Sequence, residues 1–212
     1  VNYLVMNKFP NIKYYKSNLY YNDYLKEHYK TFENLSTTNL NRIINIINKK
    51  YLLGKKIFVC GNGGSAALAN HFACDHQKIL SSIKKIKPRL LSLCSNIPLI
   101  TAISNDKKYD DVFSDQIIAQ GNKGDILICI SSSGNSKNII KAIKSAKKIG
   151  IYSISFTGFD GGYAKKNSNI NLHCSSKNYG VIESIHHSIM NIIAQYIRNL
   201  YLTKKDIRKV NF

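Results

Sequence analysis

The sequence lacks the features that mark membrane-embedded and disordered proteins. No apolar run approaches the roughly 18 residues that a membrane-spanning helix needs, and the 44% hydrophobic and 20% charged residues are typical of a globular chain. There is no internal repeat and no linker rich in proline, glycine or serine. At 212 residues, the chain is long enough to bury the core of one ordinary α/β domain. We therefore expect a single globular unit without a membrane partner.

Paired cysteines are also absent, because the five cysteines are widely spaced and form no CxxC pair. They are Cys60, Cys74, Cys94, Cys129 and Cys174. This pattern favours small buried hydrophobic residues in a reducing compartment over a disulfide framework. The N-terminal segment is polar and rich in tyrosine, with no apolar stretch before a cleavage site, so we expect no secretion signal and a cytoplasmic location.

Acidic residues are scarce, since 12 Asp and Glu face 31 Lys and Arg, which gives a formal net charge of +19. Such a balance fits nucleic-acid binding. However, only four of the basic residues are arginines, and the lysines are spread among Asn and Ile along the whole chain. A lysine-rich solvated surface of compositional origin explains this mixture as well, because base readout favours arginine and phosphate binding favours clustered charge. The stretch from Lys78 to Arg89 is the place to look for a local use of the charge.

Short apolar runs alternate with helical stretches after Gly54. Such runs are typical of strands covered on both faces in a parallel sheet. We predict strands at Ile57–Cys60, Leu90–Cys94, Ile126–Ile130, Ile151–Phe156 and Ile170–Leu172, and helices at Ser65–Leu80, about 111–120, Lys137–Ile149 and about 182–202. The alternation indicates an α/β fold, a three-layer α/β/α sandwich with a mainly parallel sheet.

The chain before the predicted sheet is expected to be largely helical. Apolar spacing predicts a long helix from Leu35 to Leu53, with Ser36, Thr37 or Thr38 as its cap. Helical spacing starts near Tyr24, and residues 1–22 lack a clear period. We therefore predict an N-terminal arm at 1–22 and one domain at 23–212, with long N-terminal and C-terminal helices.

A glycine-rich turn follows the first predicted strand, in the stretch from Ile57 to Ser65. Glycines let backbone N–H groups approach a ligand, and the N-terminus of the following helix favours anions. A tight turn without a ligand would show the same pattern. The GxGxxG spacing and the GK[ST] ending are both missing, which disfavours dinucleotide and ATP binding.

A serine-rich turn follows the third predicted strand, at residues 131–136. Hydroxyl groups in front of a helix N-terminus suit a phosphate. The alternative is that Asn135 or Ser136 simply caps the helix. Two such turns in one series favour a ligand, because ligands of open α/β sheets bind beyond the carboxyl ends of the strands. The sequence therefore predicts a phosphorylated small molecule.

Five motifs in this order resemble the sugar isomerase (SIS) domain family, from about Leu35 to Leu202. Within the family, the phosphoheptose isomerases and the DnaA initiator-associating proteins are the most similar. The motifs are Cys60-Gly-Asn-Gly-Gly-Ser65 followed by His71-Phe72-Ala73, Asn105-Asp106, Ile130-Ser-Ser-Ser-Gly-Asn-Ser136, Thr157-Gly-Phe-Asp-Gly-Gly162 and Ile182-Glu-Ser-Ile-His186. The resemblance implies a homotetramer whose N-terminal and C-terminal helices pack together, with sites near the subunit interfaces.

The resemblance also implies an activity, the aldose–ketose isomerisation of sedoheptulose 7-phosphate to a heptose 7-phosphate. It assigns the phosphate to four serines and the sugar to the polar residues around them. The implied substrate-binding residues are Ser65, Ser131, Ser133 and Ser136, with Ser132, Gly63 and Gly64 in the same turns, and Asn62, Asn105, Asp106 and Glu183.

The reaction needs a base that takes a proton from the carbon next to a carbonyl, and a group that stabilises the enediolate. In the family these are a glutamate and a histidine. By resemblance, Asp75 replaces the glutamate, and Asn191, which cannot transfer a proton, replaces the histidine. His71 and Asp75 share one helical face. With Glu183 they form a candidate metal set for zinc, whereas His71 alone could be a helix-packing residue.

His187 is a candidate for the missing proton carrier. It lies one turn after Glu183, and Glu183, His187 and Asn191 share one stripe of the last predicted helix. Alternatively, His186 and His187 mark a subunit interface. Two functions therefore stay open: an isomerase that uses Asp75 and His187, or a non-catalytic tetrameric binding protein whose partner is a DnaA-type initiator or another macromolecule, nucleic acid included.

Overall fold

The computed structural model describes residues 9–209. Its centre is a five-stranded sheet in the order β2-β1-β3-β4-β5, with every neighbouring pair parallel. The strands are β1 Ile57–Gly61, β2 Leu90–Ser92, β3 Ile126–Ile130, β4 Tyr152–Thr157 and β5 Ile170–His173. Every residue of β1 and β3 is buried, which explains their unbroken apolar sequences. The prediction of five strands in a parallel sheet is confirmed.

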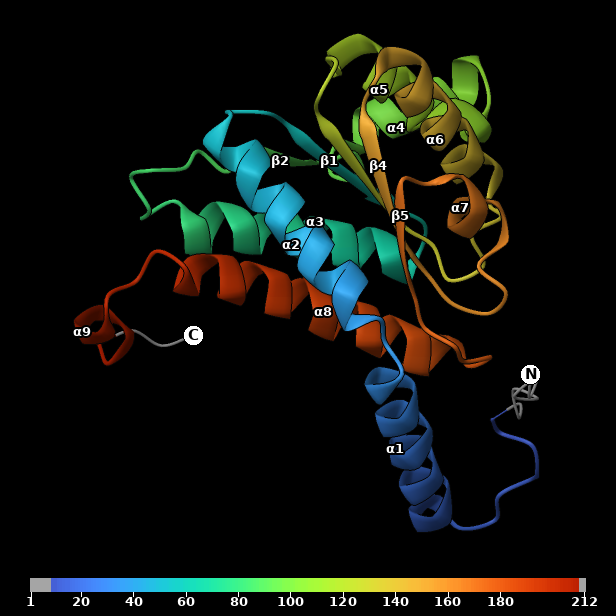
Figure 1. The fold of residues 1–212 in the computed structure, drawn as a ribbon. Coiled ribbons are helices and arrows are strands. Elements are labelled where there is room, and N and C mark those ends of the chain that lie inside the picture. Colours follow the sequence, from blue (N-terminus) through green and yellow to red (C-terminus); the bar gives the residue numbers. More distant parts are fainter. Residues whose placement is uncertain (1–8, 210–212) are drawn as a thin grey trace.

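Helices cover both faces of this sheet (Figure 1). Helices α2, α3 and α8 pack on one face, and α4 to α7 pack on the other. The bounds are α2 Thr37–Leu52, α3 Gly64–Leu80, α4 Ile97–Asp106, α5 Ser114–Gln120, α6 Lys137–Ile149, α7 Gly162–Asn167 and α8 Tyr179–Asn199. From β1 the chain moves to β2 at one edge of the sheet, and from β3 it moves to β4 toward the other edge. Because both crossovers are right-handed, α3 and α6 lie on opposite faces of the sheet. The predicted three-layer α/β/α sandwich is confirmed.

Helices α3 and α8 lie side by side and run in the same direction (Figure 1). The apolar stripe of α8 comes from five isoleucines at helical spacing, all without solvent exposure: Ile182, Ile185, Ile189, Ile193 and Ile197. On α3 the buried face includes Phe72, Ala73 and Leu80. This pairing brings residues far apart in sequence to one surface.

The N-terminal region differs from the prediction. Helix α1 (Ser17–Glu33) begins inside the segment predicted as an arm, at Ser17 rather than near Tyr24. Aromatic packing from the preceding segment explains this, because the ring of Phe9 lies 5.3 Å from that of Tyr20. Aromatic contacts with a preceding segment produce no regular hydrophobic period in the sequence of the helix itself. Residues 1–8 of the predicted arm lie outside the described residues.

Three short elements were not predicted: α4, α7 and α9 (Lys204–Ile207). No residue of α4 is fully buried, and only Ile100 and Ile103 pack partly buried against the core. The predicted helix near 111–120 is a 3₁₀ turn (Tyr109–Asp111) followed by α5. The predicted cap Ser36 is confirmed, since its side chain accepts a hydrogen bond from the Asn39 N–H.

The cysteines follow their prediction with one exception. All five are free, and four are buried, but Cys74 is exposed on α3. Its position falls on the outer side of that helix, next to the candidate residue Asp75. Within residues 9–209, no helix is long and apolar enough to cross a membrane.

Candidate functional site

The glycine-rich and serine-rich turns meet in one cavity, here called the serine cavity. They come together because β1 and β3 are neighbours and parallel, so their carboxyl ends lie at the same sheet edge. The cavity has a volume of about 140 Å³. Its lining consists of Asn62, Ser65, Ile130, Ser131, Ser132, Ser133, Ser136, Tyr179 and Glu183. Most of the predicted substrate-binding residues thus share one small polar site.

The serine turn is held by its own hydrogen bonds rather than by capping α6. The Gly134 N–H lies 3.1 Å from both the carbonyl and the hydroxyl oxygen of Ser131. The Ser136 side chain makes no cap hydrogen bond, and the Asn135 amide oxygen instead accepts from the Tyr163 N–H at 2.9 Å. The capping alternative is therefore not what the structure shows.

Ser132 marks the cavity as a place for an anion. Its hydroxyl is buried and has no hydrogen-bond partner among the described residues. A buried hydroxyl without a partner is unfavourable. A bound phosphate oxygen would supply the acceptor that the hydroxyl lacks, and the N-terminus of α6 would add a favourable field.

Two residues that the sequence analysis missed position Asn62. The Asn62 side chain exchanges two hydrogen bonds with Asn138, at 2.9 and 2.8 Å, and accepts a third from the Tyr109 hydroxyl at 2.9 Å. Asn138 is 2% exposed. The signal available in the sequence was the position of Asn138 on the apolar stripe of the helix, four residues before Ala142, because polar residues of an amphipathic helix normally face solvent.

Glu183 lies over the first turn of α3. A Cβ atom on Gly64 would stand 3.0 Å from the Glu183 Oε2 atom, so glycine is what allows this close approach. A carboxylate is favourable at a helix N-terminus. Glu183 thus lines the serine cavity, and its role in substrate binding stays a prediction.

The candidate acid–base residues gather further along α3. The Nε2 atom of His71 lies 3.1 Å from the Asp75 Oδ2 atom. The ring of His187 on α8 stands edge-on to that of His71, with ring centres 4.8 Å apart. The Nε2 atom of His187 is buried and has no partner among the described residues. Asn191 lies half-buried one turn beyond His187.

His186 has a different environment from its neighbour. It is fully buried under the sheet, with its Nε2 atom 3.4 Å from the Thr157 carbonyl oxygen and its ring beside Phe156. Burial lowers the pKa of His186 to about 4, so it is neutral at physiological pH. Of the two histidines, only His187 contacts the His71 surface.

The predicted metal set is not assembled within the described part of one chain. No group of three or more His, Cys, Asp or Glu side chains between residues 9 and 209 is placed to hold a metal ion. The reason is that Glu183 reaches Gly64 in the first turn of α3, whereas His71 and Asp75 lie two to three turns further on. The donors present do not fit a zinc site, so no step of the mechanism below uses one.

Asn105 and Asp106 lie outside the serine cavity. They end α4, where the Asn105 amide donates to the Asp106 carboxylate at 3.0 Å. Asp106 lines a separate cavity of about 510 Å³ between α4 and α5. The role of this pair in sugar binding was implied by the family resemblance alone, and it stays a prediction.

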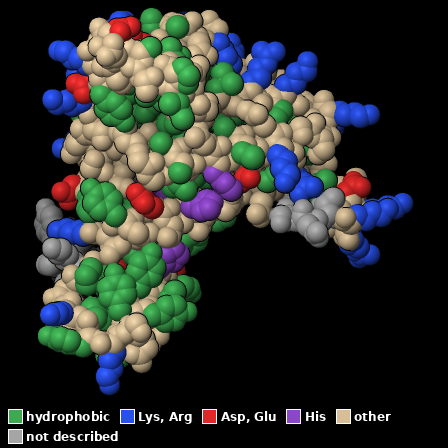
Figure 2. Space-filling model, turned by 180° about the vertical axis from the view of Figure 1, so that it is seen from behind, with side chains coloured by type: hydrophobic (Ala, Val, Ile, Leu, Met, Phe, Trp, Pro, Cys, Tyr) green, Lys and Arg blue, Asp and Glu red, His purple; other side chains and the backbone are tan. Residues whose placement is uncertain are grey.

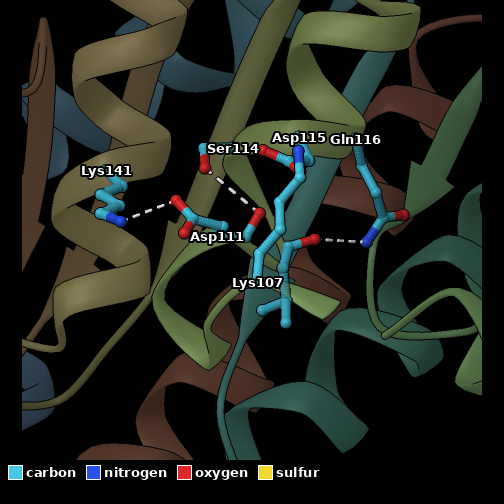
Figure 3. Close-up of polar contacts among 7 residues, drawn as sticks. Lys107, Asp111, Ser114, Asp115, Gln116 and Lys141 are labelled. Carbon is cyan, nitrogen blue, oxygen red and sulfur yellow. Dashed lines mark hydrogen bonds and ion pairs between the residues drawn. The ribbon is translucent and has the colours of Figure 1, made fainter. Parts of the chain in front are cut away.

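Ion pairs fix the layer around that second cavity (Figure 3). Lys107 contacts Asp115 at 2.6 Å, and Lys141 on α6 contacts Asp111 at 2.7 Å. The buried Gln116 amide donates to the carbonyl of Val112 at 2.7 Å. The two ion pairs link α6 to the 3₁₀ turn and the end of α4 to α5, next to Tyr109, the residue that donates a hydrogen bond to Asn62.

Comparison with known proteins identifies the family. The family model described as "SIS domain" matches residues 20–158. The chain belongs to the SIS domain family. The family predicted from the five motifs is thus confirmed, and the match includes both turns of the serine cavity.

Several phosphoheptose isomerases are similar to this SIS-domain chain. A probable phosphoheptose isomerase of Thermoplasma acidophilum is 39% identical over 175 residues, covering 82% of this chain and 95% of the relative. The phosphoheptose isomerase of Clostridium acetobutylicum is 38% identical over 168 residues, covering 79% and 85%. Among solved structures, the phosphoheptose isomerase from Neisseria gonorrhoeae has a TM-score of 0.79 at 28% identity, covering 86% of this chain and 97% of that one.

Proposed function

We propose that this SIS-domain protein is a phosphoheptose isomerase that interconverts sedoheptulose 7-phosphate and an aldose heptose 7-phosphate through an enediolate. The observation that carries this proposal is the serine cavity, in which the predicted phosphate-binding serines stand together with Asn62 and Glu183. The relatives that bear the name phosphoheptose isomerase support the choice of reaction. The free cysteines fit a reducing compartment such as the cytoplasm.

The isomerisation moves one proton between two neighbouring carbons of the sugar and a second proton between the oxygens on those carbons. The serine turn and the N-terminus of α6 hold the phosphate. Asp75 accepts the proton from the carbon next to the carbonyl and returns it to the adjacent carbon, while His71, at 3.1 Å, orients the carboxylate. His187 gives a proton to the carbonyl oxygen as the enediol forms and takes one back from the hydroxyl oxygen on the neighbouring carbon, a proton transfer that the Asn191 amide cannot carry out.

The substrate length favours a site shared between two copies of the chain. Asp75 lies about 15 Å further along α3 than Ser65, at a rise of roughly 1.5 Å per residue. A seven-carbon sugar phosphate is shorter, since its bonds span only about 10 Å. We therefore propose that the serine cavity of one copy faces the Asp75 and His187 of another copy.

A homotetramer built through the terminal helices would provide this arrangement. Helix α1 reaches out from the body of the molecule, and apolar side chains gather on that lobe (Figures 1 and 2). Its Tyr21, Leu25 and Tyr29 are 61%, 45% and 66% exposed. An apolar helix surface of this kind is typical of a contact between subunits.

The isomerase activity is tested with the purified full chain and sedoheptulose 7-phosphate, with and without added zinc. We expect turnover, a fall of about a hundredfold or more in kcat for Asp75→Asn and His187→Gln, and almost no change for Cys74→Ser. Cys74 is the matched control because it is the exposed neighbour of Asp75 on α3. If the protein turns over no phosphosugar under either condition and captures a macromolecular partner instead, it is the non-catalytic binding protein of the alternative hypothesis.

The shared site is tested by mixing two inactive variants. Asp75→Asn removes the base, and Ser133→Asp places a carboxylate in the serine cavity. If the site combines two copies, unfolding and refolding the variants together yields mixed oligomers with some intact sites and measurable activity. Activity that never returns in mixed oligomers of confirmed composition would place the whole site within one chain.

A further inference from the structure

A further cavity, separate from both the serine cavity and the cavity between α4 and α5, lies at the β5 edge of the sheet and is here called the β5 cavity. It opens between the start of α2 and the loop that leads into β5, has a volume of about 470 Å³, and shares no lining residue with the serine cavity. β5 is the last strand in the sheet order, so one of its edges has no partner strand. The cavity is large enough for a small organic molecule.

The lining of the β5 cavity has a clear charge preference. Three basic side chains, Arg42, Lys165 and His173, line it, and no Asp or Glu does. Most of the remaining lining is made of asparagines and serines. Neither Arg42 nor Lys165 forms an ion pair with any residue in the described part of the chain. Two unpaired cations beside neutral donors favour an anion that also carries hydroxyl groups.

Two polar atoms of the lining residues lack hydrogen-bond partners. The Ser168 hydroxyl and the His173 Nε2 atom are buried and unbonded within residues 9–209. The Ser132 hydroxyl in the serine cavity is likewise buried and has no hydrogen-bond partner among the described residues. Since buried polar atoms normally have partners, a small rotation of either side chain toward a bound molecule would recover a hydrogen bond.

His173 lines the β5 cavity with an uncharged ring. Its Nδ1 atom lies 3.0 Å from the Thr157 hydroxyl, whose single proton the Asn171 amide oxygen also accepts at 3.3 Å. Burial, and then the charge of Lys165, lower the pKa of His173 to about 4, so the ring is neutral at pH 7. A neutral imidazole has one N–H group to offer to an anion without adding positive charge to the cavity.

We propose that the β5 cavity is a second binding site, which takes a small phosphate ester of a hydroxylated molecule. Arg42 and Lys165 match the charge of a phosphate group. The asparagine side chains suit the hydroxyl groups. This binding site does not depend on the proposed isomerase activity.

A ligand in this cavity is also connected to the candidate catalytic residues. His173 contacts the Thr157 hydroxyl, and the Thr157 carbonyl oxygen lies 3.4 Å from the Nε2 atom of His186. His186 precedes His187, which stands against His71. Binding at the β5 cavity is therefore expected to affect the isomerase site through this chain of contacts, and this second step does rest on the proposed function.

The site is tested by titrating the full chain with inorganic phosphate while the histidine ring signals are followed by NMR. The background is Ser133→Asp, which blocks the serine cavity. We expect a saturable shift of the His173 signals, a smaller one at His186, and none at His28, which stacks between Tyr24 and Phe32 on α1. Lys165→Gln should weaken binding roughly tenfold or more, whereas the matched control Lys166→Gln, an exposed neighbour outside the cavity lining, should not.

Three outcomes would overturn the proposal. The first is a His173 shift that rises linearly without saturating, which indicates an adventitious ion only. The second is an equal loss of binding in Lys165→Gln and Lys166→Gln, which indicates general surface charge. The third is the absence of any His173 response, which indicates a cavity that holds water. Because none of these readouts uses turnover, they are distinguishable from a failure of the isomerase assay.

Discussion

Neighbouring residues in this chain have opposite roles because of the helix face they occupy. His186 is enclosed by the sheet, whereas His187 faces α3 and lies against His71. His76 resembles His186, since it is fully buried and its Nδ1 atom is 2.6 Å from the Tyr51 hydroxyl. Burial lowers the pKa of His76 to about 3. The protein therefore contains histidines that contribute to stability only in the neutral form.

These buried histidines predict a loss of stability in mild acid. In the unfolded chain, histidines become protonated below their ordinary pKa of 6.5. In the folded chain, His76 and His186 stay neutral until the pH approaches their lowered pKa values of about 3 and 4. The free energy of unfolding therefore decreases as pH falls from 6.5 toward 4, by about 2 kcal/mol for each histidine at pH 5. Urea unfolding at pH 7.5 and pH 5 measures this decrease.

Two variants separate this effect from general acid denaturation. His186→Gln should show a smaller loss between the two pH values, since it removes one titrating group. His28→Gln is the matched control, because His28 is only half-buried on α1 and should leave the loss unchanged. An identical pH dependence in the parent and in His186→Gln would contradict the assignment.

At the scale of elements, the serine turn is locked against the loop that precedes α7. Gly134 has φ +65°, and a Cβ atom there would lie 2.0 Å from the Gly161 carbonyl oxygen. The Ala164 N–H also donates to the Gly134 carbonyl oxygen at 3.0 Å. The shape of the serine cavity thus depends on the contact between two loops that follow different strands.

This contact predicts a large effect of Gly134→Ala. The added methyl group must push the two loops apart, so we expect weaker substrate binding and a loss of stability beyond the ordinary strain of a positive φ. Gly54→Ala is the matched control, because Gly54 has φ +63° and open space around its Cβ position. It should cost only about 1–2 kcal/mol, from backbone strain alone. Thermal unfolding and KM measurements on both variants test this; equal effects would exclude the clash.

At the scale of the whole molecule, the net charge of +19 forms no single stripe on the face that Figure 2 shows. Lys and Arg side chains are scattered around the visible outline. Among residues 9–209, three lysines are in ion pairs with Asp: Lys26, Lys107 and Lys141. This distribution favours the lysine-rich surface over a dedicated nucleic-acid face, with a broad positive field as its consequence.

A broad field predicts that ionic strength affects the reaction with an anionic sugar phosphate. We expect kcat/KM to fall several-fold from low to high salt, because screening shortens the range of attraction to about one Debye length. Replacing Lys84, Lys85 and Lys87 by Gln should reduce this salt dependence as much as replacing Lys204, Lys205 and Lys209. If only one set has an effect, the charge acts locally.

Sequence reasoning predicted the strands, the three layers and both turns of the serine cavity. It succeeded there because buried strands leave unbroken apolar runs, and phosphate-binding turns need glycines and hydroxyls at fixed places after a strand. It failed at α4, a helix with no fully buried residue, in which Ile100 and Ile103 pack only partly buried against the core. It also missed Asn138 and Tyr109, which act only through contacts with Asn62.

The chain's sequence by itself determined its family, its layered fold and the residue types that meet a phosphate, since these depend on local pattern and spacing. Only the tertiary structure decided which residues share a site. The parallel packing of α3 and α8 placed His187 against His71 and Glu183 over Gly64, and so separated the predicted metal set. Contacts of this kind depend on how two helices pack against each other, and the spacing of residues along one helix does not reveal that packing.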